Sequence, residues 1–124
     1  MSGPAPARRQ AYRRGLSAET LAAWALRLKG YAVIDRRYRS GAGEIDLVAR
    51  RGRLLAFVEV KARQTREAAL EAVSDTAARR IAAAAELWVA RHPAFADFDQ
   101  RFDIVLVVPR RWPHHMKDAF RPAR

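Results

Sequence analysis

The stretch of sequence that best predicts the fold of this chain is GEIDLVARRGRLLAFVEVK, residues 43–61. Its two outer segments, 43–47 and 57–61, largely alternate charged and apolar residues, as strands with one buried face do. Arg51 and Gly52 lie between these segments, and glycine readily adopts the positive φ that a tight hairpin turn requires. The stretch therefore predicts a β-hairpin with one face to bury.

Successive side chains of a strand point to opposite faces, so residues two apart share a face. One face of the hairpin is expected to carry its acids and its lysine: Glu44 and Asp46 on the first strand, Glu59 and Lys61 on the second. The other face is expected to carry the apolar residues that can be buried: Ile45, Leu47, Val58 and Val60. The two strands would then bring several carboxylates together.

The hairpin register decides whether these acids meet. A two-residue loop at Arg51 and Gly52 places Glu44 opposite Glu59. In the same register Asp46 lies diagonally from Glu59, at roughly 7 Å, which is close enough for both to reach one cation. A three-residue loop would place the acids of the two strands on opposite faces, which would exclude a shared site.

Neighbouring carboxylates repel one another unless a cation neutralises them. Mg²⁺ prefers oxygen ligands and is commonly held by one or two carboxylates together with substrate phosphates, so Asp46 and Glu59 are candidate ligands. Lys61 is a candidate to orient an attacking water or to stabilise charge that develops on a phosphate. The alternative is that Glu59 and Lys61 form a surface ion pair of little energy. The spacing fits metal-assisted phosphodiester hydrolysis but does not distinguish it from that ion pair.

The composition favours a nucleic-acid partner. The 124 residues suffice for one domain, and 24 Lys and Arg against 13 Asp and Glu give a formal net charge of +11, which attracts polyanions. The chain has no cysteine, which excludes disulfides and thiolate metal sites. It has no apolar run that approaches a membrane span and no signal-peptide core, so we expect a cytoplasmic protein without a membrane partner.

The residues before the hairpin predict an arm, a helix and a strand. Residues 1–15 are rich in Pro, Ala and Arg and are expected to form a mobile basic arm, which leaves residues 16–124 as the single domain. A helix is expected over 18–29, between a Ser17 cap and a Gly30 stop. A strand with a polar second half, typical of a sheet edge, is expected over 31–38.

Glu19 lies in the first turn of the expected helix, where the helix dipole alone would explain an acid. Three elements are expected after the hairpin: a loop or short helical turn over 64–71, a helix over 74–91 that begins at Ser74, and a central strand over 102–108. Asp103 interrupts the apolar strand, and a structural role is favoured for it. His114 and His115 follow in a stretch without periodicity, where paired histidines are usually solvated.

This αβββαβ order, with Asp46 on the second strand and Glu59-x-Lys61 on the third, resembles the restriction-endonuclease-like PD-(D/E)xK nuclease core. The segments 43–47 and 57–63 are also similar to the signature of the YraN family, small bacterial proteins predicted to be nucleases related to archaeal Holliday-junction resolvases. The similarity extends beyond the hairpin to Gly15, Glu19, Gly30-Tyr31, Arg101-Phe102-Asp103, His115 and Ala119-Phe120. The fold class that it implies is α/β, with a mixed sheet flanked by helices.

The resemblance also implies residue roles. Asp46, Glu59 and Glu19 would bind Mg²⁺ or Mn²⁺, and Lys61 would assist the chemistry. Supporting roles would fall to Glu44, Arg63 and Asp103. The arginines that are candidates for nucleic-acid contacts are Arg37, Arg39, Arg63, Arg79 and Arg80. Arg37 and Ala77 stand where the family more often has Asn and Lys, a difference that concerns the substrate-contacting surface more than the metal site.

Three functions are compatible with these features. The first is a metal-dependent endonuclease that acts on DNA rather than RNA, on branched or structured DNA in repair or recombination, as a homodimer with two sites. The second is a nucleic-acid-binding protein of the same fold that does not cut and serves a partner complex. The third is a housekeeping α/β domain whose charges only solvate it. Salt-dependent DNA binding is expected of the first two.

Overall fold

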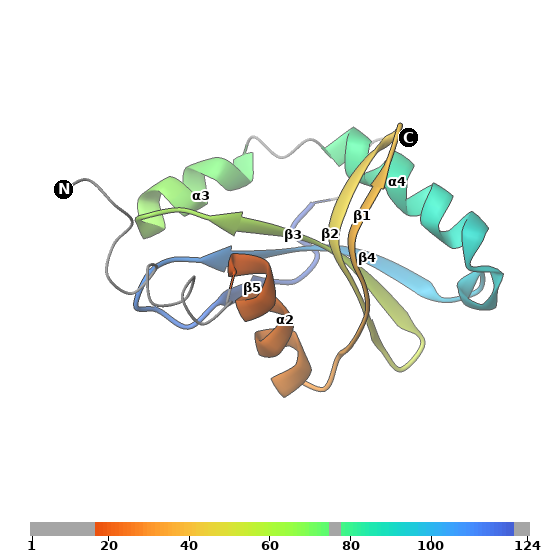
Figure 1. Ribbon diagram of the computed structural model, residues 1–124, viewed down its shortest axis with the longest axis horizontal. Coiled ribbons are helices and arrows are strands. Elements are labelled where there is room, and N and C mark those ends of the chain that lie inside the picture. Colours follow the sequence, from red (N-terminus) through yellow and green to blue (C-terminus); the bar gives the residue numbers. More distant parts are fainter. Residues whose placement is uncertain (1–16, 75–77, 121–124) are drawn as a thin grey trace.

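The computed structural model describes residues 17–74 and 78–120, so the arm predicted over 1–15 lies outside the described residues. One helix precedes three strands, two further helices follow, and two strands end this part of the chain (Figure 1). The elements are α2 (Ala18–Leu28), β1 (Ala32–Ser40), β2 (Gly43–Arg51), β3 (Leu54–Ala62), α3 (Arg66–Ser74), α4 (Ala78–Arg91), the 3-10 turn η1 (Pro93–Phe95), β4 (Asp99–Val107) and β5 (His114–Met116). The predicted αβββαβ order is confirmed.

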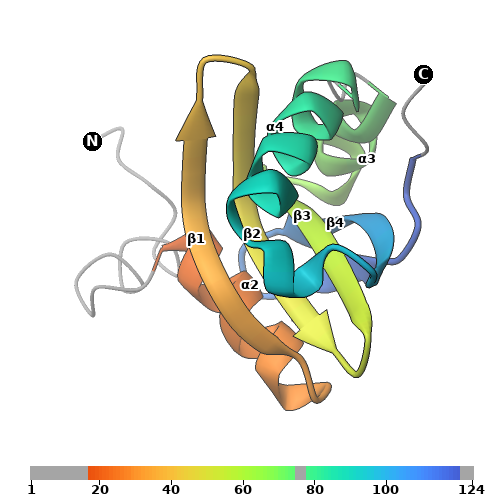
Figure 2. The ribbon, with the colours of Figure 1, turned by 90° about the vertical axis from the view of Figure 1, so that its right-hand side faces the viewer.

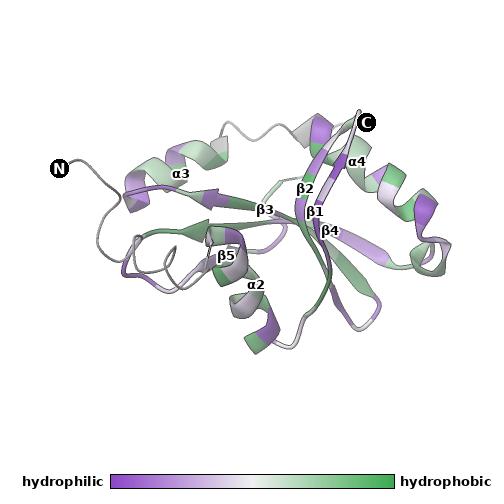
Figure 3. Cartoon of the chain, viewed as in Figure 1, coloured by the Kyte–Doolittle hydropathy of each residue, from purple (hydrophilic) through white to green (hydrophobic). Residues whose placement is uncertain are grey.

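The strands form one mixed sheet in the order β1-β2-β3-β4-β5. The only parallel pair among the described strands is β3 with β4, which α3 and α4 connect, and the other neighbours are antiparallel. A connection between parallel strands must cross one face of the sheet, and α4 covers that face here. The expected edge strand is β1, which is mostly hydrophilic in its second half (Figure 3).

Helices cover both faces of the sheet, so the structure has an apolar core on each side. On one face α2 contributes Ala22, Ala23 and Leu26, which pack on Leu47 and Val58. On the other face α4 packs on the sheet, and the two helices lie on opposite sides of it (Figure 2). The core beneath α4 consists of Ile45, Val48, Leu55, Phe57, Ile81, Ala84, Ala85 and Trp88.

The hairpin turn lies one residue later than predicted. Arg51 pairs with Leu54, so the loop is Gly52-Arg53, and Gly52 has φ +61°. Arg51 remains in β2, where its guanidinium lies 5.6 Å from the ring centroid of Tyr31. The register therefore shifts by two residues: Phe57 opposes Val48 and not Asp46. A shift of two does not by itself move a side chain to the other face, and Glu44, Asp46 and Glu59 still line one cavity.

Side-chain alternation along β2 is interrupted at Asp46. Ile45 and Val48, three residues apart, both pack in the core beneath α4, whereas Leu47 packs beneath α2. The expectation that Ile45 and Leu47 share one buried face was wrong, because both faces of this sheet are covered and each needs apolar residues. In the facing strand, Arg37 has φ +53°, a conformation that non-glycine residues seldom adopt.

Three boundaries after the hairpin also differ from the prediction. The segment expected to be a loop or short turn contains the helix α3, and Ser74 ends that helix and does not begin the next one. The first turn of α4 starts at Ala78. A short edge strand, β5, lies in the C-terminal stretch where no periodicity was visible. None of the described helices is long and apolar enough to cross a membrane.

Gly43 is required at the start of β2 because α4 passes directly over it. A Cβ atom at this position would overlap the backbone carbonyl of Arg80. Gly43→Ala is therefore expected to lower the free energy of unfolding by about 1–3 kcal/mol, the usual cost of forcing an extra carbon into a packed site, as measured by urea denaturation. Gly41→Ala is the control, since a Cβ there meets nothing within 4 Å, and equal losses in both variants would contradict the explanation.

Candidate functional site

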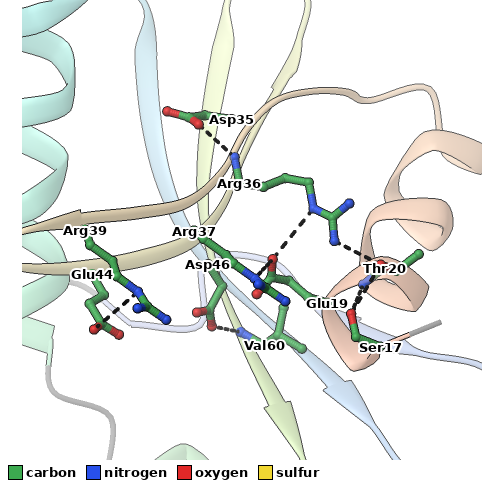
Figure 4. A network of polar contacts seen from close by, with 10 residues as sticks. All are labelled: Ser17, Glu19, Thr20, Asp35, Arg36, Arg37, Arg39, Glu44, Asp46 and Val60. Carbon is green, nitrogen blue, oxygen red and sulfur yellow. Dashed lines mark hydrogen bonds and ion pairs between the residues drawn. The ribbon is translucent and has the colours of Figure 1, made fainter. Parts of the chain in front are cut away.

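Asp46 lies where β2 and β3 separate. The last registered pair of the two strands on this side is Leu47 with Val58. Beyond it, the backbone N–H of Val60 donates a hydrogen bond to Oδ2 of Asp46 at 2.7 Å (Figure 4). The carboxylate thus accepts a bond that a strand carbonyl would otherwise accept, and this fixes Asp46 between the two strands.

The surroundings of Asp46 disfavour its ionised form. Burial raises the pKa of Asp46 above its ordinary value, and the hydrogen bond from Val60 acts in the opposite direction. Three nearby carboxylates raise the pKa further: Glu59, Glu19 and Glu44. A cation bound beside Asp46 would remove this penalty, because it favours the charged form of every acid in the group.

Glu59 and Lys61 lie on β3, side by side on the face that carries α3. They pair in register with Ile104 and Leu106 of β4, and those two residues pack against α3. Nζ of Lys61 lies 2.8 Å from Oε1 of Glu59, and only 13% of the lysine side chain and 26% of the glutamate side chain are exposed. The ion pair considered as the alternative is present, but it is more buried than an ordinary surface pair.

Glu19 approaches Asp46 from the N-terminus of α2. The Ser17 side chain caps this helix by accepting a hydrogen bond from the Thr20 backbone N–H at 3.1 Å, which sets the first turn in place. Oε1 of Glu19 lies 3.1 Å from Nε of Arg37 and 3.6 Å from Nε of Arg36 (Figure 4). Glu19 therefore has specific partners in β1 in addition to the helix dipole.

An open cavity lies beside Asp46, with a volume of about 110 Å³. Its walls come from β2, β3 and the first turn of α4: Glu44, Asp46, Glu59, Arg80 and Ile81. Glu44 is largely exposed and forms a long ion pair with Arg39, 3.8 Å between Oε1 and Nε. The cavity is thus lined by three carboxylates and by the exposed Arg80.

Each carboxylate around Asp46 is paired with a basic side chain of its own: Glu19 with Arg37, Glu44 with Arg39, and Glu59 with Lys61. Within residues 17–74 and 78–120, no three Asp, Glu or His side chains are placed together as a ready cage for a metal ion. The donor set still suits a hard cation such as Mg²⁺, which keeps several waters and needs only one or two carboxylates from the protein. Asp46 and Glu59 would supply them.

Comparison with known proteins identifies the family of this chain. Residues 18–107 match the group described as "Uncharacterised protein family UPF0102". The chain belongs to this family, which is the YraN family expected from the sequence. A UPF0102 protein of Parvibaculum lavamentivorans is 61% identical over 112 residues, 90% of this chain and 84% of the relative. One from Chelativorans sp. is 56% identical over 113 residues, 91% of each chain.

The matched UPF0102 region contains the other predicted site residues, and not all of them join the cavity. Arg80 does, whereas Arg63 is exposed and donates to the backbone carbonyl of the adjacent Ala62. The side chain of Arg79 lies outside the described part. The ion pair of Arg36 with Glu19 was not predicted from the sequence, because regular alternation would point Arg36 and Arg37 in opposite directions.

Asp103 stands apart from the cavity, on the α2 face of β4, and is fully buried. Its carboxylate accepts hydrogen bonds from Arg101 (2.8 and 2.7 Å), from Nε2 of His115 (2.7 Å) and from the backbone N–H of Asp118 (2.9 Å). The structural role predicted for Asp103 fits this network, and the side chain of His115 is only 3% exposed, so the expectation that it is solvated was wrong. The family resemblance, which included both Arg101-Phe102-Asp103 and His115, was the one signal in the sequence that could have linked them.

Proposed function

We propose that this UPF0102 protein is a Mg²⁺- or Mn²⁺-dependent endonuclease that acts on DNA. The observation that carries the proposal is the placement of Asp46, Glu59 and Lys61 together at the point where β2 and β3 separate, beside an open acidic cavity. Two acids that can hold a metal ion, with a lysine beside them, can support metal-assisted phosphodiester hydrolysis.

In this proposal Asp46 and Glu59 hold the metal, and Glu19 is a further ligand. When bound, the metal would supply Lewis acidity toward the phosphate and would make water a better nucleophile. Lys61 orients the attacking water and stabilises the negative charge that develops on the phosphate oxygens. Water oxygen bonds to phosphorus, the bond from phosphorus to one sugar oxygen breaks, and that oxygen takes a proton, which leaves a phosphomonoester and a hydroxyl group.

The charge of the protein supports a polyanionic substrate. The net charge of +11 favours binding to phosphates, and Arg39, Arg63 and Arg80 are exposed near the cavity or at the end of β3. We propose DNA over RNA, branched or structured DNA as the preferred form, a role in repair or recombination in the cytoplasm, and a homodimer that supplies two sites to the two strands of a junction.

The test is cleavage of labelled duplex, single-stranded, flap and four-way-junction DNA with Mg²⁺, Mn²⁺ or EDTA. Wild type is expected to cut only with metal, and Asp46→Asn is expected to bind DNA without cutting. The amide oxygen that this substitution introduces can still accept the Val60 hydrogen bond. Because folding raises the pKa of Asp46, its ionised form destabilises the fold near neutral pH, so the variant is expected to melt no lower than wild type.

A second function is favoured by one observation: each acid around Asp46 already has a basic partner. A protein that binds DNA and does not cut would need this neutralisation and no metal. In that case wild type would bind DNA with a strong dependence on salt. Neither wild type nor Asp46→Asn would cleave the DNA, with or without metal. Cleavage by wild type alone would exclude this function.

A further inference from the structure

Arg36 and Arg37 converge on one carboxylate oxygen although they are consecutive residues of a strand. In a regular strand their side chains would point to opposite faces. Here Nε of Arg37 lies 3.1 Å and Nε of Arg36 lies 3.6 Å from Oε1 of Glu19. Arg37 has φ +53°, and this left-handed residue interrupts the alternation of β1 (Figure 4).

The conformation of Arg37 carries an energetic penalty that the surrounding contacts must offset. A non-glycine residue is disfavoured in the left-handed region, because its Cβ atom comes too close to the following carbonyl oxygen. Arg36 also donates to Oγ1 of Thr20 at 2.9 Å, so β1 is anchored to the first turn of α2 at the position of Glu19. Strain held by its surroundings at a candidate site is a signal of function.

Of the four basic side chains that pair with the acids around Asp46, Arg37 is the one best placed to compete with a metal ion. Arg36, the second partner of Glu19, lies farther from it and is anchored to Thr20. Lys61 lies with Glu59 inside the proposed machinery, and Arg39 makes only a long contact with an exposed Glu44. Glu19 is 15% exposed, whereas the side chain of Arg37 is 62% exposed. The glutamate is therefore fixed in place, and the arginine is free to leave.

We propose that Arg37 is an internal counterion of the acid cluster, which a divalent cation displaces from Glu19 and which then binds a phosphate of the nucleic acid. The proposal rests on the proposed function, because it takes Glu19 as a metal ligand. The guanidinium presents a planar fork that fits a phosphate, and its exposure gives it access to one. Metal binding and DNA binding are then coupled through this one side chain.

The first test measures Mn²⁺ binding to metal-free protein by titration calorimetry. Arg37→Asn is expected to bind Mn²⁺ about fivefold more tightly than wild type, since loss of an exposed ion pair is worth up to about 1 kcal/mol. Asparagine also tolerates the left-handed backbone, so the fold is preserved. Arg37→Lys keeps the charge and is expected to stay within about twofold of wild type. The control for the loss of one charge is Arg53→Gln. This substitution, in the hairpin loop, breaks an exposed ion pair with Asp97.

The second test measures coupling with labelled duplex DNA, in Ca²⁺ and in EDTA. The ratio of the Kd in EDTA to the Kd in Ca²⁺ is expected to be about fivefold larger for wild type than for Arg37→Asn, and unchanged by Arg53→Gln. Equal Mn²⁺ affinity or equal coupling in wild type and Arg37→Asn would overturn the proposal and leave the nuclease function standing. Absence of Mn²⁺ binding in both proteins would overturn both. Tighter Mn²⁺ binding and reduced coupling without cleavage would support the counterion and remove only the nuclease.

Discussion

Lys61→Met is expected to lower metal-dependent cleavage by about two orders of magnitude or more, while DNA affinity stays within about twofold of wild type. The Nζ atom of Lys61 lies 2.8 Å from Glu59, and the side chain is 13% exposed, so methionine fills the same space without the charge. The loss falls on catalysis because a fixed cation acts most strongly where charge develops in the transition state. Single-turnover cleavage and fluorescence anisotropy measure the two quantities separately.

Lys117→Met is the matched control, because it removes the same charge from an exposed lysine near Lys29, away from the cavity. It is expected to cut at nearly the wild-type rate. If Lys61→Met cuts as fast as Lys117→Met while Asp46→Asn does not cut, Lys61 is only the partner of Glu59. If Lys61→Met loses binding and cleavage together, its role is in DNA contact and not in the chemical step.

The hairpin and the first helix were predictable because the sequence patterns that specify them involve residues close together in the chain. Alternation in β2 and β3 and the glycine between them specify a hairpin, and Ser17 and Gly30 delimit α2. The register error arose because the positive φ of Gly52 falls on the first loop residue and not on the second. The strand β5 and the helix α3 are short, and their stability comes from contacts with β4, which no local pattern reveals.

The acids of the site were predictable, but the groups that neutralise them were not. Asp46, Glu59 and Glu44 line one cavity, because an error of two residues in the register does not by itself move a side chain to the other face. The pairing of Glu19 with two consecutive arginines depends on the left-handed backbone of Arg37, which the alternation rule cannot foresee. His115 meets Asp103 across twelve residues of sequence through β5, which was itself missed.

Asp103→Asn is expected to lower the free energy of unfolding at pH 7 by about 3 kcal/mol, the cost of removing one partner from a buried ion pair. Asp103 is fully buried, and its loss of charge leaves Arg101 and His115 without a carboxylate. Arg101 also donates to the Tyr31 hydroxyl at 2.7 Å, and Nδ1 of His115 lies 2.6 Å from Nζ of Lys29, so the network ties β4 and β5 to the end of α2. Urea denaturation measures the change.

The pH dependence of stability tests whether the charge of Asp103 is the source of this stabilisation. Burial alone would raise the pKa of Asp103, but hydrogen bonds from Arg101, His115 and the Asp118 backbone outweigh it and lower the pKa from 3.8 to about 2. A carboxyl whose pKa is lower in the folded than in the unfolded chain stabilises the fold at pH values above its unfolded pKa. About 2 kcal/mol of stability should therefore be lost as the pH falls from about 4 to 2. Asp103→Asn should lose this part of the acid transition, whereas Asp97→Asn, on an exposed pair with Arg53, should retain it. An unchanged acid transition in Asp103→Asn would assign that stability to another carboxylate.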